Sequence, residues 1–187
     1  MMAELSFHLI DLAQNSYRAE ARTIRVGVEE WFSRDLLVLT VEDDGRGMDE
    51  DLVERVQDPF FTTKGGKKVG LGIPLLKEGA HVCNGDFSIQ SEVGRGTRVR
   101  ASFQRSHWDR PPLGDLGSTF LMLLIGMEEA NLICNYQNDR GVFSLSTEEI
   151  REQVGTEVSL SDPDIYRFLS DYVQEALAGL APGDHLS

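Results

Sequence analysis

The sequence has little of what an oxidised, membrane-spanning or secreted protein would need. Among its 187 residues there are two cysteines, Cys83 and Cys134, which lie far apart, and this predicts a reducing compartment rather than a disulfide framework. The longest apolar run, "FLMLLIGM" from Phe120, is much shorter than the about 20 residues of a membrane-spanning helix. No charged and then apolar leader precedes the first helix signal. We therefore expect a cytoplasmic protein with no membrane partner.

Basic residues are also scarce. Eighteen Lys and Arg stand against 31 Asp and Glu, for a formal net charge of -13 at pH 7. Such a chain repels a phosphate backbone unless its basic residues gather on one face, so nucleic acid is not an expected partner. The four histidines share no metal-ligand spacing, and no role is assigned to them. They are His8, His81, His107 and His185.

The two familiar nucleotide-binding fingerprints are missing as well. The segment "GGKKVGLG" lacks the Gly-Lys-Ser/Thr ending of a P-loop, and no Gly-x-Gly-x-x-Gly follows a strand. What is present is "PFFTTKGGKKVGLGIPLL" from Pro59, in which glycines and lysines run into an apolar segment. A helix that begins near Leu71 would direct its free N–H groups and its positive dipole end at an anion.

The first part of the chain predicts an α+β fold. Apolar residues at helical spacing and β-branched runs indicate a helix, two antiparallel strands, a short helix, a longer helix and a hairpin. These elements are expected at about 5–21, 23–31, 36–44, after 49, 71–82 and 85–103. The first domain is taken as residues 1–105.

Composition shifts at "SHWDRPPLGD", where two prolines and a glycine mark a linker at 106–113. Residues 114–187 form a small acidic α+β module of unknown role. We expect it to contain a helix, a hairpin with "NDRG" as its turn, and two further helices. Asp162 is the expected cap of the last helix, and Pro163 its first residue.

Five short motifs follow one another in a fixed order. They are Asp11 four residues before Asn15, then "DDGRGM", "PFFTTK", "VGLG" and "GRGT". In this order the sequence resembles the GHKL (Bergerat-fold) ATPase superfamily, shared by DNA gyrase, the large heat-shock chaperones, sensor histidine kinases and mismatch-repair ATPases. The resemblance covers about 5–103. "LGDL" from Leu113 is also faintly similar to the start of the second domain of mismatch-repair ATPases.

The resemblance implies a two-layer α/β sandwich, with a mixed, mostly antiparallel sheet and helices on one face. It also implies ATP and Mg²⁺ as ligands and Asp11 as the catalytic residue. The implied ATP-binding residues are Asn15, Arg18, Asp43, Gly45, Gly47, Met48, Thr62, Thr63, Lys64, Gly70, Leu71, Gly72 and Thr97, with Asn15 also holding the metal.

Physical chemistry supplies reasons for several of these roles. The amide oxygen of Asn15 can enter an octahedral Mg²⁺ shell without adding charge. Asp43 can accept a hydrogen bond from the adenine amino group, which guanine does not offer at that position. Thr97 can orient a water molecule or the Asp43 carboxylate, and the glycines leave room for the ring against the backbone.

Each motif alone has an ordinary structural explanation. Asn15 on a helix is usually a solvated polar residue, and "DDGRGM" alone is usually a turn whose aspartates cap the next helix. Thr62 and Thr63 are ordinary loop residues when taken alone, and Lys67 with Lys68 an ordinary solvated charge pair. The order of all five motifs favours nucleotide binding over these explanations.

The sequence departs from the family in three places. Asp11 stands where many hydrolysing members carry glutamate, and it is one methylene shorter. Only a few residues precede the first helix, so we do not expect a complete sensor histidine kinase, which needs a phospho-accepting histidine upstream. The lid between Phe61 and Gly70 is short.

Three functions stay open at this point. The first is a Mg·ATP-binding protein with slow ATPase or phosphotransfer activity in a regulatory role. The second is a non-catalytic switch in which ATP admits a partner protein. The third is a serine kinase and anti-sigma-like regulator. An unidentified protein partner is also expected, and a homodimer is a further option.

Overall fold

The computed structural model describes residues 4–60, 71–127, 129–155 and 158–181. Its helices are α1 (Ser6–Arg18), the 3-10 turn η1 (Phe32–Arg34), α2 (Glu50–Arg55), α3 (Gly72–Val82), α4 (Leu116–Gly126), α5 (Thr147–Val154) and α6 (Pro163–Leu180). Its strands are β1 (Thr23–Trp31), β2 (Leu36–Asp43), β3 (Phe87–Glu92), β4 (Gly96–Gln104), β5 (Asn131–Asn138) and β6 (Gly141–Ser146).

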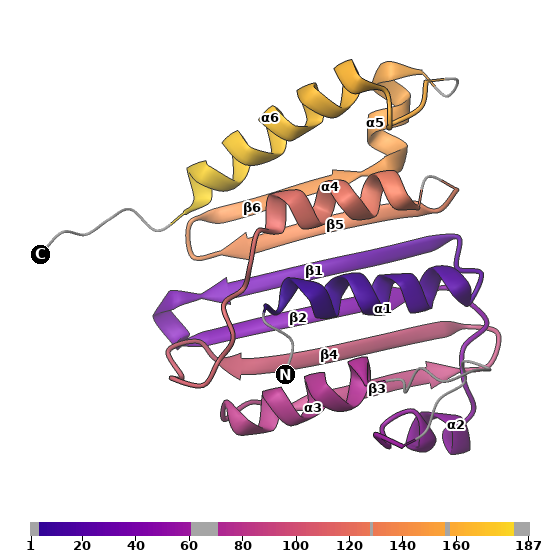
Figure 1. Ribbon diagram of the computed structural model, residues 1–187, viewed down its shortest axis with the longest axis vertical. Coiled ribbons are helices and arrows are strands. Elements are labelled where there is room, and N and C mark those ends of the chain that lie inside the picture. Colours follow the sequence, from indigo (N-terminus) through magenta and orange to yellow (C-terminus); the bar gives the residue numbers. More distant parts are fainter. Residues whose placement is uncertain (1–3, 61–70, 128, 156–157, 182–187) are drawn as a thin grey trace, which may run out of the picture.

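The six strands form one mixed sheet in the order β3-β4-β2-β1-β5-β6 (Figure 1). Within it β1 and β5 run parallel, and the other neighbouring strands are antiparallel. Helices α1, α3 and α4 lie side by side over one face of this sheet (Figure 1). The predicted α+β fold class, with a mostly antiparallel sheet under a helical layer, is confirmed.

The core lies between the sheet and these helices, because strand residues alternate between the two faces. On β1 the side chains of Ile24, Val26 and Val28 are buried under the helices. The opposite face of the sheet is polar: Glu42 of β2 lies between Arg25 and Arg98 on the neighbouring strands. An Arg98–Glu42 ion pair of 3.7 Å crosses that exposed face.

The C-terminal module adds β5 and β6 to the sheet of the first domain, since β5 pairs along β1 from Asn131 to Asn138. The connection to this module also contacts the first helix. Backbone N–H groups of Leu5 and Ser6 donate to the carbonyls of Pro112 and Leu113 at 2.9 Å. The module and the predicted ATP-binding domain therefore share a sheet and a helical layer.

Most predicted elements are present, with shorter helices than expected. α1 ends at Arg18 because the chain turns there, with Glu20 at a φ of 61°. The hairpin turn lies at 138–141, as predicted from "NDRG". Asp162 caps α6, and Pro163 is its first residue. None of the helices in the described ranges is long and apolar enough to cross a membrane.

Candidate functional site

The first helix carries three of the predicted site residues. Asp11, Asn15 and Arg18 lie on α1, whose buried side is anchored by Leu9, Leu12 and other core residues. Asp11 and Asn15 are half-buried and stand one helical turn apart. An Arg18 guanidinium N–H donates to the Asn15 amide oxygen at 3.3 Å. The predicted metal ligand thus has a cation as its neighbour.

Asp43 ends β2 and is buried, with 9% of its surface exposed. Its two carboxylate oxygens are bound by different donors. The Ser16 hydroxyl of α1 donates to Oδ2 at 2.6 Å, and the Gly45 backbone N–H donates to Oδ1 at 2.9 Å. These two bonds fix the plane of the carboxylate.

The loop after β2 passes close to other backbone segments. A Cβ on Gly45 would lie 2.8 Å from the Ala19 carbonyl oxygen. One on Gly47 would collide with the Glu92 carbonyl, and Gly47 has a φ of +66°. Packing within the protein therefore requires glycine at both positions. This is a second reason for glycine here, besides the predicted contact of a ring with this loop.

Met48 and Thr97 meet through a serine that the motifs did not include. The Ser91 hydroxyl accepts a hydrogen bond from the Met48 backbone N–H at 2.8 Å, and its oxygen lies 2.8 Å from Thr97 Oγ1. Thr97 faces Asp43 in the β2–β4 register. Within the described residues the Asp43 carboxylate is nevertheless held by Ser16 and Gly45, while Thr97 holds Ser91.

The start of α3 lies against Asp11. Leu71 is the residue before α3, and Gly72 is its first residue. A Cβ on Gly72 would collide with Asp11 Oδ2, so a glycine is needed for the carboxylate to approach this backbone. The N-terminal N–H groups of a helix favour negative charge. The geometry thus puts the predicted catalytic carboxylate beside a predicted anion-binding helix end.

His8 is buried in the same region, although no motif pointed to it. Only 3% of its surface is exposed, and its Nδ1 has no hydrogen-bond partner in the described residues. Burial lowers the pKa of His8 below its ordinary value, while the Asp11 carboxylate and a hydrogen bond with the Gly72 backbone act in the opposite direction. A neutral imidazole therefore lies under the junction of Asp11 and Gly72.

Four predicted site residues lie outside the described residues. Thr62, Thr63, Lys64 and Gly70 fall in the range 61–70. The aromatic box is described only at Phe60, which is 93% exposed. The predicted roles of this segment stay predictions.

The ordinary explanation of "DDGRGM" was that its aspartates cap the next helix, but the structure has another residue in that role. Asp49 caps α2 by accepting from the Leu52 N–H at 2.8 Å. Asp44 accepts from the backbone N–H groups of Arg22 and Thr23. Burial alone would raise the pKa of Asp44, but these bonds hold it below its ordinary value. Asp43, the other aspartate of the motif, is held by Ser16 and Gly45 and caps no helix.

The residues present fit Mg·ATP. Among the described residues no group of three or more His, Cys, Asp or Glu could hold a metal, so a cation here would need ligands such as phosphates and water besides Asn15. Asp43 offers a carboxylate oriented by Ser16 and Gly45, and the start of α3 offers backbone N–H groups. Ser16, Ser91 and His8 were missed because their spacing in sequence gives no signal.

Comparison with known proteins identifies the family of the chain. The sequence profile of the family described as "Histidine kinase-, DNA gyrase B-, and HSP90-like ATPase" matches residues 3–107, more than half of the chain. The chain belongs to this family. It contains an ATP-binding domain of the histidine kinase type.

Similar proteins include several sensor kinases. The sensor kinase CckA of Brucella abortus is 27% identical over 195 residues, covering 80% of this chain and 21% of that protein. Sensor histidine kinase YxdK of Bacillus subtilis is 32% identical over 104 residues, covering 53% of this chain and 32% of that protein. The chain thus spans no more than a third of the length of these relatives. The catalytic domain of histidine kinase ThkA is a structural neighbour with 24% identity and a TM-score of 0.43, covering 56% of this chain and 68% of that one.

Proposed function

We propose that this protein binds Mg·ATP and uses it for slow hydrolysis or phosphoryl transfer in a regulatory role. The observation that carries the proposal is the contact between Asp11 and the first residue of α3. It puts a carboxylate, a potential general base, next to helix N–H groups that would bind the terminal phosphates.

The other site residues have complementary tasks in this proposal. Asn15 supplies a neutral oxygen to Mg²⁺, and Arg18 supplies positive charge beside it. Asp43, held by Ser16 and Gly45, accepts from the adenine amino group and selects ATP over GTP. Bound ATP supplies the phosphoryl group, and these side chains bind and orient it.

Turnover is expected to be slow because Asp11 is shorter than glutamate. A general base acts within about 3 Å of its proton, or through one water molecule, and the shorter side chain needs that water. The test is single-turnover hydrolysis of ATP by the wild type and by Asp11→Asn. We expect the variant to lose hydrolysis and to keep its ATP affinity, the pattern of a group used in the transition state. Hydrolysis by Asp11→Asn at the wild-type rate would make Asp11 a structural carboxylate.

A second candidate is a non-catalytic switch, favoured by the connections between α1 and the C-terminal module. The Tyr17 hydroxyl of α1 donates to Glu129 at 3.3 Å, and the Asn131 N–H donates to the carbonyl of Arg22, which lies between α1 and β1, at 2.7 Å. A shift of α1 on ATP binding would reach β5 through these contacts. ATP binding without any turnover would support the switch, whereas phosphate transfer to a co-purified protein would identify a kinase.

A further inference from the structure

The two edges of the sheet, β3 and β6, differ in what protects them from pairing with a further strand. Helix α2 packs beside β3, and that strand ends at the charged residue Glu92 (Figure 1). The β6 strand, Gly141–Ser146, contains no charged residue and no proline. Soluble proteins often protect an edge strand with such residues, because its free backbone groups would otherwise pair with another chain. The β6 edge has neither.

The outward backbone groups of β6 have no partner in the described part of the chain. On its inner side β6 pairs with β5 along its whole length. In an antiparallel ladder every second residue of an edge strand directs its N–H and C=O away from its neighbour. Among the described residues only those of β5 bond the backbone of 142–145, and Val142 is 61% exposed. A further strand could therefore form hydrogen bonds along β6.

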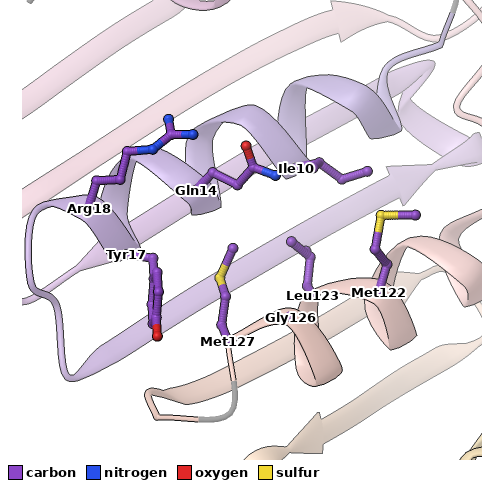
Figure 2. A pocket seen from close by; sticks show the side chains of 8 residues that line it. All are labelled: Ile10, Gln14, Tyr17, Arg18, Met122, Leu123, Gly126 and Met127. Carbon is purple, nitrogen blue, oxygen red and sulfur yellow. The ribbon is translucent and has the colours of Figure 1, made fainter. Parts of the chain in front are cut away.

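Helix α6 extends the helical layer to this edge. Ile10 of α1 and Leu123 of α4 line one hollow of about 200 Å³ between these two helices (Figure 2). On the other side of α4, a Cβ on Gly117 would lie 3.7 Å from Val173 and 3.8 Å from Leu177 of α6. The layer thus continues from α1 through α4 to α6, and α6 lies next to β6 at the edge of the sheet (Figure 1).

A series of aromatic rings leads from the core to the surface of α6. The ring centroid of the fully buried Phe120 lies 6.4 Å from that of Phe143 on β6. The Phe143 ring lies 6.2 Å from Tyr172 of α6, which stacks on Phe168 at 6.4 Å. Tyr172 and Phe168 are 47% and 60% exposed. A strand added to β6 would lie about 4.8 Å beyond it, so its side chains on the helical side would contact these two rings.

The charge at this edge selects the kind of strand. Residues 114–187 contain 13 Asp and Glu but three Lys and Arg. Exposed carboxylates on α6 stand three, four and seven positions from Phe168, and so share its side of the helix. They are Asp164, Asp171 and Glu175. A second copy of this chain would bring the same negative charge to a twofold pairing of β6 strands, which repulsion disfavours. A basic segment is favoured instead.

We propose that β6 binds an extended segment of a basic partner protein, which pairs with it as a further strand of the sheet. Apolar residues of the segment pack against Tyr172 and Phe168, and Lys or Arg residues beside them pair with the carboxylates of α6. Backbone hydrogen bonds supply affinity, whereas the rings and carboxylates supply the preference for an apolar and basic sequence. This interaction requires no nucleotide, so it does not rest on the proposed function.

The test is fluorescence anisotropy with the labelled peptide KKVTVTVKK in the absence of ATP. The peptide KKVPVPVKK has the same charge but lacks the N–H groups of its central residues, and EEVTVTVEE reverses the charge. We expect saturable binding of KKVTVTVKK and about tenfold weaker binding of each other peptide, the effect of losing one or two hydrogen bonds or charge pairs. Hydrogen exchange should show bound KKVTVTVKK protecting backbone amides of β6, and not those of β3.

Two tyrosine and phenylalanine variants of α6 form a matched pair. Phe168→Ser should fold, because Phe168 is mostly exposed, and should weaken peptide binding by about two- to tenfold, the effect of losing an aromatic contact. Tyr166 is 46% exposed but lies on nearly the opposite side of the helix, two positions earlier. Tyr166→Ser should therefore bind the peptide as the wild type does.

Two double variants test the charge in the same way. Asp171→Asn with Glu175→Gln should weaken binding of KKVTVTVKK and reduce its dependence on salt. Glu50→Gln with Glu54→Gln makes the same change of charge, also four positions apart, on the exposed side of α2. This second pair should leave peptide binding unchanged.

The absence of saturable binding, equal affinity for KKVTVTVKK and KKVPVPVKK, or protection of β3 amides in place of β6 amides would overturn the proposal. Sedimentation velocity tests the alternative occupant. A wild-type dimer that Phe168→Ser dissociates would show that a second copy of the chain occupies the β6 edge, and would also overturn the proposal.

Discussion

The buried hydrogen bond between Ser16 and Asp43 should be the most sensitive point of the nucleotide site. The bond is 2.6 Å long and joins Ser16, a residue that is 5% exposed, to Asp43, which is 9% exposed. Ser16→Ala removes the donor and leaves Asp43 Oδ2 buried without it. Hydrogen bonds to charged groups contribute about 1.5–3 kcal/mol, so we expect a loss of this size in the free energy of unfolding.

The assay is urea unfolding of the wild type, Ser16→Ala, Asp43→Ala and the double variant. The cycle should give a coupling energy of about 1.5–3 kcal/mol between the two residues. Ser6→Ala is the matched control, because Ser6 is buried on the same helix but its hydroxyl donates to Glu4 at 3.3 Å. We expect Ser6→Ala to lower the free energy of unfolding by less than Ser16→Ala does. A coupling energy below about 0.5 kcal/mol would refute the argument that this bond orients Asp43. Calorimetry on Asp43→Ala should also show ATP affinity reduced by about 1–3 kcal/mol.

Three further predictions concern the same site. Asn15→Ala should remove the Mg²⁺ dependence of ATP binding in calorimetry, and an unchanged dependence would contradict the metal assignment. Gly72→Ala should displace the Asp11 carboxylate and slow hydrolysis as Asp11→Asn does, with unfolding unchanged within about 0.5 kcal/mol; wild-type hydrolysis would show that the contact is dispensable. Because burial depresses the pKa of His8, the wild type should lose stability as pH falls below about 6.5, and His8→Gln should lose less. Unfolding curves from pH 8 to pH 5 test this, and identical pH dependence of the two proteins would contradict it.

The sequence alone determined the class of the protein and most of its elements. The order of Asp11, Asn15, Asp43 and the glycine motifs resembles that of the ATPase family, and this resemblance predicted the fold. Strands showed as alternating runs, and the cap of α6 at Asp162 showed as a local Asp-Pro signal. Local signals of this kind depend on neighbours in sequence, so a sequence reading can find them.

Only the tertiary structure decided which distant residues meet. Ser16 and Asp43 are 27 positions apart, and Met48 and Ser91 are 43 apart, so no spacing rule links them. The pairing of β5 with β1, which joins the C-terminal module to the ATP-binding sheet, also has no local signal. Such contacts are set by how the helices and strands pack against one another. The residues next to a hydrogen-bonding side chain or a strand edge in sequence do not identify its partner.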